Sequence, residues 1–328
     1  MQKIKFIVFS LLAVLISCSG NEENSYESTV YIVGGNDITE PIATSVLWIN
    51  DDIMELSEDK YSGVNSVYVN DGNVYAAGYE YEDEYYNNQY YATLWTNGTP
   101  TVLSQHPSCA YSVFAQGKVY AAGYEKIGDK YFATLWSNSV TARLSNLTSV
   151  AYSVCVSQGK IYVVGAIENA NGVYNAVVWK NGVSTILSTN SSAAYSVFEK
   201  NGNVYIAGEN NDKATLWVNG EAETLSTEYS TAHSVFVANN RVYVAGEKNS
   251  IATLWKDGVP TALSTNTSSA HGVFVAGGNV YVAGITNELI DHRVGYPTLW
   301  INGEQKLLPV ISRFIDPFNC YVSGIFVK

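Results

Sequence analysis

Basic residues are scarce in this 328-residue chain. Lysine and arginine together number 18, against 30 aspartate and glutamate residues, and the formal net charge at pH 7 is −12. No segment gathers positive side chains into the stripe that binds phosphate backbones or anionic headgroups. This composition argues against nucleic acid as a partner and against electrostatic docking on an anionic membrane.

Long hydrophobic runs and helical patterns are also missing. The apolar stretch at residues 6–16 is too short to span a bilayer, but it follows Lys3 and Lys5 and has the length of a secretory signal sequence. From residue 30 onward no segment has the periodicity of an amphipathic helix. We therefore expect an all-β protein downstream of an export signal.

Signatures of catalysis are absent too. The chain has no Gly-x-Ser-x-Gly nucleophile elbow, no sialidase-type Asp-box and no Trp-Asp dipeptide. Two histidines, His233 and His271, could share a metal, but no carboxylate or third histidine has a place beside them. We predict no catalytic residue, no metal and no cofactor.

The most abundant feature of the chain is a sequence repeat made of several short motifs. A Tyr-x-x-Gly piece occurs seven times and ends at Gly34, Gly78, Gly123, Gly165, Gly208, Gly246 and Gly284. A second piece follows each copy and contains Trp48, Trp95, Trp136, Trp179, Trp217, Trp255 or Trp300, which are all the tryptophans in the chain. A residue type confined to one position of a repeat serves the architecture of that repeat.

Each repeat is predicted to form two β-hairpins. Its apolar runs are four to five residues long and rich in β-branched and aromatic residues. Asn-Gly or Asp-Gly pairs follow most of the tryptophans, and such pairs favour the tight turns of hairpins. The tryptophans are about 38–47 residues apart, a spacing typical of four-stranded propeller blades. We name the strands of a blade A to D, from the channel outward.

The two ends of the repeat array complement each other. The first repeat begins at a B strand, residues 30–34, and the chain ends in an unpaired A-type strand, residues 323–327. Pairing the two closes the ring, which leaves no open sheet edge. The sequence therefore predicts one domain at residues 30–328, a seven-bladed β-propeller with velcro closure by the C-terminal strand.

A candidate binding site lies at the mouth of the central channel. One residue precedes the serine or glycine of each A strand, and the seven are Asn65, Tyr111, Tyr152, Tyr195, His233, His271 and Ser323. We predict that the first six bind a ligand, because flat rings with polar tips stack on sugars or grip protein side chains. The alternative is that each tyrosine packs against the next blade and caps a loop. No acid occupies these positions, so the carboxylate pair of a glycosidase is missing.

The connection at residues 79–91 has the most unusual local composition. Tyrosines alternate with Glu80, Glu82, Asp83 and Glu84. It could form an aromatic platform for a glycan or supply oxygen ligands to Ca²⁺. It could equally be a long hairpin with solvated acids, and its acid spacing does not match an EF-hand loop.

Three of the four cysteines fall within the repeats. Cys155 occupies a position where other copies have phenylalanine, so we expect a small buried side chain there. Cys109 and Cys320 could form a disulfide in an exported protein, although their blades are not neighbours.

The N-terminal residues resemble those of bacterial lipoproteins. Leu15-Ile-Ser-Cys18 is similar to a lipobox, which implies cleavage of a signal peptide, residues 1–17, and lipidation of Cys18. Residues 18–29 then form a flexible acidic tether, similar to the export signal of Bacteroidetes surface lipoproteins. The resemblance implies an outer-membrane lipoprotein at the cell surface, or facing the periplasm, that contacts the membrane through its lipid anchor only.

The repeat itself resembles a family through its motifs Val-Tyr-x-Ala-Gly, Ala-Thr-Leu-Trp-x-Asn-Gly and Ala-x-Ser-Val-Phe-Val. It is similar to uncharacterised secreted and lipoprotein β-propellers of Bacteroidetes-type bacteria, a resemblance that implies fold and location but no activity.

Three functional hypotheses follow. The first is a surface-anchored, monomeric, non-catalytic propeller that recognises a glycan or protein on the face made by the B–C and D–A loops. The second is a polysaccharide-active enzyme, a lyase or hydrolase, that uses the histidines at the channel mouth. The third is a purely structural partner in an outer-membrane complex.

Overall fold

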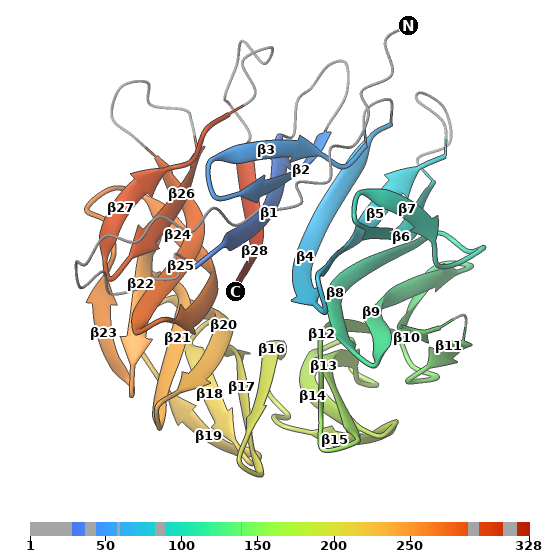
Figure 1. The fold of residues 1–328 in the computed structure, drawn as a ribbon. Coiled ribbons are helices and arrows are strands. Elements are labelled where there is room, and N and C mark those ends of the chain that lie inside the picture. The colour runs from blue at the N-terminus through green and yellow to red at the C-terminus, as the bar shows by residue number, and fades with distance from the viewer. Residues whose placement is uncertain are drawn as a thin grey trace, which may run out of the picture.

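The protein is a ring of seven β-sheets. The computed structural model describes residues 28–36, 44–57, 60–82, 89–138, 140–287, 295–310 and 320–328. These ranges contain seven four-stranded antiparallel sheets, arranged as blades around a central axis (Figure 1). The predicted all-β, seven-bladed propeller is confirmed. No helix in the described ranges has the length and hydrophobicity of a membrane span.

The strands of each blade succeed one another from the axis outward. The A strands are β28 (Cys320–Val327), β4 (Ser62–Asn70), β8 (Ser108–Gln116), β12 (Ser149–Ser157), β16 (Ser192–Lys200), β20 (Ser230–Ala238) and β24 (Ser268–Ala276). The B strands are β1 (Val30–Asn36), β5 (Asn73–Tyr81), β9 (Lys118–Ile127), β13 (Lys160–Glu168), β17 (Asn203–Asn210), β21 (Arg241–Lys248) and β25 (Asn279–Asn287). The C strands are β2 (Thr44–Ile49), β6 (Tyr90–Thr96), β10 (Lys130–Ser137), β14 (Tyr174–Lys180), β18 (Ala214–Val218), β22 (Ile251–Lys256) and β26 (Gly295–Ile301). The D strands are β3 (Asp52–Glu55), β7 (Thr99–Val102), β11 (Val140–Arg143), β15 (Val183–Ile186), β19 (Glu221–Thr224), β23 (Val259–Ala262) and β27 (Glu304–Leu307).

The C-terminal strand closes the ring as predicted. Strand β28 pairs antiparallel with β1, with Tyr31 opposite Phe326, and supplies the A strand of the first blade. Two backbone hydrogen bonds between Thr29 and Lys328, of 2.7 and 2.9 Å, extend this pairing by one residue. Figure 1 shows the C-terminus inside the ring, beside β1. Closure removes the exposed sheet edge that an open array would present.

Each C–D turn is tied back to its own B strand. The turn residues Asn97 and Gly98 have φ of 50° and 80°, the left-handed conformation that the Asn-Gly pair favours. The Asn97 Oδ1 atom also accepts a hydrogen bond of 2.9 Å from the Val74 N–H. The same bond recurs in every blade, at Asn50, Asn138, Asn181, Asn219, Asp257 and Asn302. The asparagine or aspartate therefore sets both the turn and the attachment of strand C to strand B.

The tryptophans form the contacts between blades. Trp95, Trp179, Trp217, Trp255 and Trp300 are fully buried, and Trp48 and Trp136 nearly so. Trp179, for example, packs with Ala122, Ala133 and Leu135 of the preceding blade. Strands with a neighbouring blade on each side are buried on both faces, which explains their uninterrupted apolar runs. Truncating one of these tryptophans to alanine costs about 3–5 kcal/mol by the usual scale for core aromatics.

The repeat glycine creates a bulge in the A strand beside it. In the second blade Val64 lies opposite Gly78 and Ser66 opposite Ala77, so Asn65 is an extra, unpaired residue. A Cβ atom on Gly78 would collide with the carbonyl oxygen of Gly63. The same bulge and the same collision recur at Gly34, Gly123, Gly165, Gly208, Gly246 and Gly284. Only glycine lets the two backbones approach so closely, and a bulge redirects its extra residue.

Two alanine substitutions in the fifth blade separate this role from that of a turn glycine. Gly208→Ala places a methyl group against the Ala193 carbonyl, whereas a Cβ at Gly220 meets nothing within 4 Å but sits at a φ of 95°. We predict a loss of unfolding free energy of about 3 kcal/mol for Gly208→Ala and about 1 kcal/mol for Gly220→Ala. Urea unfolding followed by tryptophan fluorescence measures both. Equal losses would contradict the role assigned to the repeat glycine.

Candidate functional site

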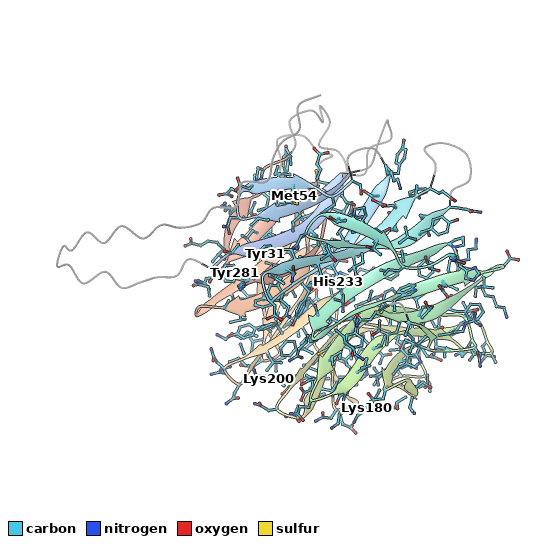
Figure 2. All side chains as sticks on the ribbon, turned by 45° about the vertical axis from the view of Figure 1, so that its right-hand side comes forward. Tyr31, Met54, Lys180, Lys200, His233 and Tyr281 are labelled. Atoms are coloured by element: carbon cyan, nitrogen blue, oxygen red, sulfur yellow. The ribbon has the colours of Figure 1, made fainter. Side chains whose placement is uncertain are left out.

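The seven bulges direct their extra residues to one end of the central channel. These residues are the seven predicted ones: Asn65, Tyr111, Tyr152, Tyr195, His233, His271 and Ser323. All of them line a single cavity of about 160 Å³ on the axis. Figure 2 shows His233 toward the middle of the molecule. The structure therefore brings the predicted ring together, while its role in ligand binding stays a prediction.

Five of the seven side chains form a continuous row of rings. The centroid distances are 5.4 Å for Tyr111–Tyr152, 5.3 Å for Tyr152–Tyr195, 5.9 Å for Tyr195–His233 and 5.0 Å for His233–His271. The tilted and edge-on arrangement of these rings is the one that aromatic pairs prefer. The row spans five successive blades and leaves the side chains half-buried. Neighbouring rings thus hold one another in place.

Asn65 and Ser323 have a different role from the rings. The Asn65 Nδ2 atom donates to the Ala110 carbonyl at 2.9 Å, and the Ser323 hydroxyl donates to the Val64 carbonyl at 2.6 Å. Both side chains therefore join the backbone of the next blade. This contact stabilises the junction between the second and third blades, while the predicted role of Asn65 in ligand binding stays a prediction.

A belt of serines lies directly below the rings. Ser66, Ser112, Ser153, Ser196 and Ser234 each follow a bulged residue, and each accepts a hydrogen bond of 3.1–3.3 Å from the N–H of a valine in the next blade. The inner edge of an A strand faces the channel, where its N–H groups have no strand to pair with. Gly272 takes the serine position in the seventh blade, because a Cβ there would meet Ile325 Cγ2 at 2.7 Å.

The ring side chains are uncharged at neutral pH. Burial lowers the pKa of His233 to about 3, with a further contribution from His271, and burial lowers the pKa of His271 to about 4. Burial also raises the pKa of Tyr152 to about 12, and it raises the pKa values of Tyr111 and Tyr195 further. Removal from water disfavours the charged form of either residue type. The mouth therefore presents neutral rings with polar tips.

A larger hollow opens beside the channel mouth, over the third to fifth blades. We call it the tyrosine groove; its volume is about 500 Å³. Its lining includes Tyr111, Tyr124, Tyr131, Tyr152, Tyr174 and Tyr195, together with Ala166 and Glu209. Tyr124, Ala166 and Glu209 are equivalent residues, since each follows the repeat glycine of its B strand. The small side chain of Ala166 leaves room between its two larger counterparts.

Glu209 is the functional candidate that the sequence analysis missed. Its Oε1 atom accepts a hydrogen bond of 2.8 Å from the Tyr195 hydroxyl, and its Oε2 atom one of 3.4 Å from Thr231. The prediction concerned only the bulge position, yet the residue after the repeat glycine also reaches the groove. The signal was present, because this position is glutamate at Glu209 and Glu247 but tyrosine, alanine, isoleucine or glycine elsewhere.

The tyrosines at the base of the 79–91 connection pack on one another. Tyr79 and Tyr90 lie 5.0 Å apart by ring centroids, and the Tyr90 and Tyr124 hydroxyls share a hydrogen bond of 2.6 Å. Residues 83–88, which include Asp83 and Glu84 of the platform and calcium hypotheses, lie outside the described residues. In the described part of the chain no group of three or more His, Cys, Asp or Glu could hold a metal ion.

The described cysteines are buried side chains. No disulfide joins Cys109 and Cys320, so the one considered between them is not formed. Cys155 is buried as predicted, at the one interruption of an inner aromatic ring otherwise made by Tyr68, Phe114, Phe198, Phe236, Phe274 and Phe326. The predicted signal peptide and lipidation site, Cys18, lie outside the described residues, as does His292.

The histidine pair predicts how stability depends on pH. Folding lowers both pKa values below the usual 6.5, so the unfolded chain binds more protons as the pH falls below 6.5. The stability contributed by the two neutral histidines is present above pH 6.5 and is lost toward pH 4. Lowering the pH from 7 to 5 should therefore reduce the unfolding free energy of the wild type by about 2–4 kcal/mol through these two histidines.

A double variant, His233→Gln with His271→Gln, tests this prediction. Urea unfolding at pH 7 and pH 5 should show that the double variant loses less unfolding free energy on acidification than the wild type does. The exposed His106 offers a matched control, since His106→Gln should leave the wild-type difference unchanged. An undiminished loss in the double variant would contradict the burial of neutral imidazoles.

Comparison with known proteins gives the fold and no family. No protein-family model and no curated protein matches the chain. It is similar to Pyrococcus horikoshii acylaminoacyl peptidase (13% identity, TM-score 0.54, covering 88% of this chain and 51% of that one). It is also similar to a Mycobacterium tuberculosis puromycin-hydrolyzing peptidase (10% identity, TM-score 0.55, covering 82% and 51%). A third structure is the β-propeller domain of the Trilobed protease from Pyrococcus furiosus (14% identity, TM-score 0.52, covering 89% and 96%).

The chain spans about half the length of the two peptidases. The third match is described as an open velcro topology, whereas β28 here pairs with β1 and closes the first blade. At identities this low the likeness concerns the fold alone. The chain is a seven-bladed β-propeller, a fold compatible with binding or with catalysis.

Proposed function

We propose that this protein is a non-catalytic binding propeller that recognises a glycan or a protein ligand on the face made by its B–C and D–A loops. The observation that supports this most directly is the row of rings at the channel mouth, which continues into the tyrosine groove. Binding sites are concave and mostly apolar, with a few polar groups that set orientation. A groove of tyrosines with one carboxylate has this composition.

The tyrosines of the groove differ in their exposure to solvent. Tyr174 is 40% exposed at the edge of the groove, whereas Tyr152 is half-buried. Large rigid side chains of this kind provide contact area at low cost in conformational entropy. Because the rings pack on one another, the surface is formed before a ligand arrives, which favours affinity.

The attachment point of the tether is consistent with this function. Each B strand runs from the face of the A–B and C–D turns to the face of the long loops, so Thr29 lies on the turn side, paired with Lys328. In our proposal, a lipid anchor on Cys18 holds this turn face toward the outer membrane. The loop face and its groove then point away from the membrane, toward ligands outside the cell.

The competing hypothesis, an enzyme that uses the channel-mouth histidines, has less support. A general base works best when its pKa lies near the operating pH. The pKa values of about 3 and about 4 make His233 and His271 weak bases at neutral pH. Their rings also pack on each other and on Tyr195, where they continue the row of aromatic side chains.

Replacing the three central tyrosines tests the proposed function. A Tyr111→Ala, Tyr152→Ala, Tyr195→Ala variant should lose binding to ligands found on a glycan array by about 100-fold, since stacking contributes roughly 1 kcal/mol per ring. The matched Tyr→Phe triple variant keeps the ring faces and should retain most of the affinity.

Circular dichroism and thermal melting establish that each variant is folded. Unchanged binding by the folded alanine variant would reject the tyrosine row as the binding surface.

A further inference from the structure

We propose that the tyrosine groove binds a saccharide that carries a protonated amino group, with Glu209 as the partner of the ammonium. This inference rests on the proposed function and names a ligand class for the same site. It starts from the one acidic side chain among the residues that line the groove.

Glu209 is a half-buried carboxylate without a counter-ion. Its two described partners, Tyr195 and Thr231, are neutral hydroxyls, and no described lysine or arginine forms an ion pair with it. A carboxylate has about four acceptor positions, so the two hydroxyls leave acceptor capacity for a ligand. Partial burial of an unpaired charge is costly, and a cation that enters the groove would offset that cost.

The walls of the groove favour a cation as well. The face of a tyrosine ring attracts ammonium groups, and six tyrosines line the hollow. The chain itself places a lysine in this way, since Lys126 Nζ lies 5.8 Å from the ring centroid of Tyr131. The net charge of −12 attracts cations toward the protein from a distance.

The shape and chemistry of the groove favour an amino sugar over a simple ammonium ion. The hollow extends over three blades and has a volume of about 500 Å³, well beyond the size of a lone ammonium group. Tyrosine faces can stack on the C–H face of a sugar ring while tyrosine hydroxyls exchange hydrogen bonds with its hydroxyl groups. A quaternary ammonium has no donor for Glu209, whereas a protonated amino group has three.

A comparison of three oligosaccharides isolates the contribution of the amino group to binding. Short β-1,4-linked oligomers of glucosamine, N-acetylglucosamine and glucose share a backbone and differ only at carbon 2. Calorimetry at slightly acidic pH should show the glucosamine oligomer binding wild-type protein at least about 10-fold more tightly than either neutral oligomer. Repeating the titrations at high salt reduces non-specific attraction by the net charge.

Glu209→Gln tests the assigned partner. It should abolish the preference, so that the glucosamine oligomer binds the variant no more tightly than the neutral oligomers do. Glu221→Gln, an exposed position in strand β19 of the same blade, removes the same charge elsewhere and should retain the preference. A preference that persists in Glu209→Gln would overturn the assignment.

Ala166→Tyr tests the location of the site. It gives the fourth blade the side chain that Tyr79 and Tyr124 provide in the second and third, and it should fill the groove. We expect all three oligomers to lose binding. Because Ala166 is only 2% exposed, the larger side chain should also lower the melting temperature, and circular dichroism must first show that the variant is folded. Full binding by folded Ala166→Tyr would contradict the groove as the site.

The remaining outcomes separate the two proposals. Equal binding of all three oligomers would refute the amino-sugar proposal and leave a glycan-binding propeller in place. Absence of binding to these oligomers, together with a negative glycan array, would refute the amino-sugar proposal and also the proposal that the propeller binds glycans. Binding of a lysine-rich peptide that depends on Glu209, with no oligosaccharide bound, would assign the ammonium to a protein ligand and overturn the saccharide.

Discussion

The close approach of each repeat glycine to the A strand beside it determines the rest of this structure. With no Cβ, Gly78 and its six counterparts allow the backbone carbonyl of the A strand to come within contact distance, and the A strand gains one unpaired residue at that point. That residue is turned toward the axis. Seven bulges at the same height along the axis therefore place seven side chains in one ring. In strands without bulges, side chains at this height would point to one or the other face of each blade.

Contacts between blades hold this ring in register. Serine hydroxyls below the bulges accept N–H groups from the next blade. A second set of serines starts six of the seven A strands and accepts N–H groups from the C strand of the preceding blade, as Ser108 does from Ala92. The tryptophans fill the space farther from the axis. Because these contacts use constant positions of the repeat, the bulge position and the position after the glycine are free to vary. The side chains at the channel mouth can therefore change without loss of the fold.

The variation is concentrated on one side of the ring. The fourth blade has Ala166 where its neighbours have Tyr124 and Glu209, and this difference in size is what opens the tyrosine groove. The histidines on the following blades continue the row of rings but stay neutral, since their burial opposes protonation. The tyrosine groove is the place where this neutral aromatic row meets a carboxylate, since Tyr195 donates a hydrogen bond to Glu209 there.

Most of the fold could be predicted from the sequence, because each of the seven repeats predicts the same four-stranded blade. Strand order, the Asn-Gly turns and velcro closure all follow from repeat spacing and phase. The ring of seven residues was also predictable from its position before the serine. The groove was not, since it depends on a bulge that shifts the side-chain alternation of the A strand and on Ala166, which has no conspicuous chemistry. Glu209 was missed although its position varies visibly in the sequence, because only the folded chain shows that the residue after the repeat glycine also reaches the groove. The absence of a disulfide between Cys109 and Cys320 likewise required three-dimensional geometry.

The repeat glycine, through its bulge, turns one side chain of each blade toward the channel mouth. A crystal structure of the Gly165→Ala variant tests it most directly, because a methyl group there would collide with the Val150 carbonyl. We predict that the bulge at Tyr152 is lost and that its ring leaves the row between Tyr111 and Tyr195. A structure in which Tyr152 keeps its centroid 5.4 Å from Tyr111, with the bulge intact, would contradict the claim.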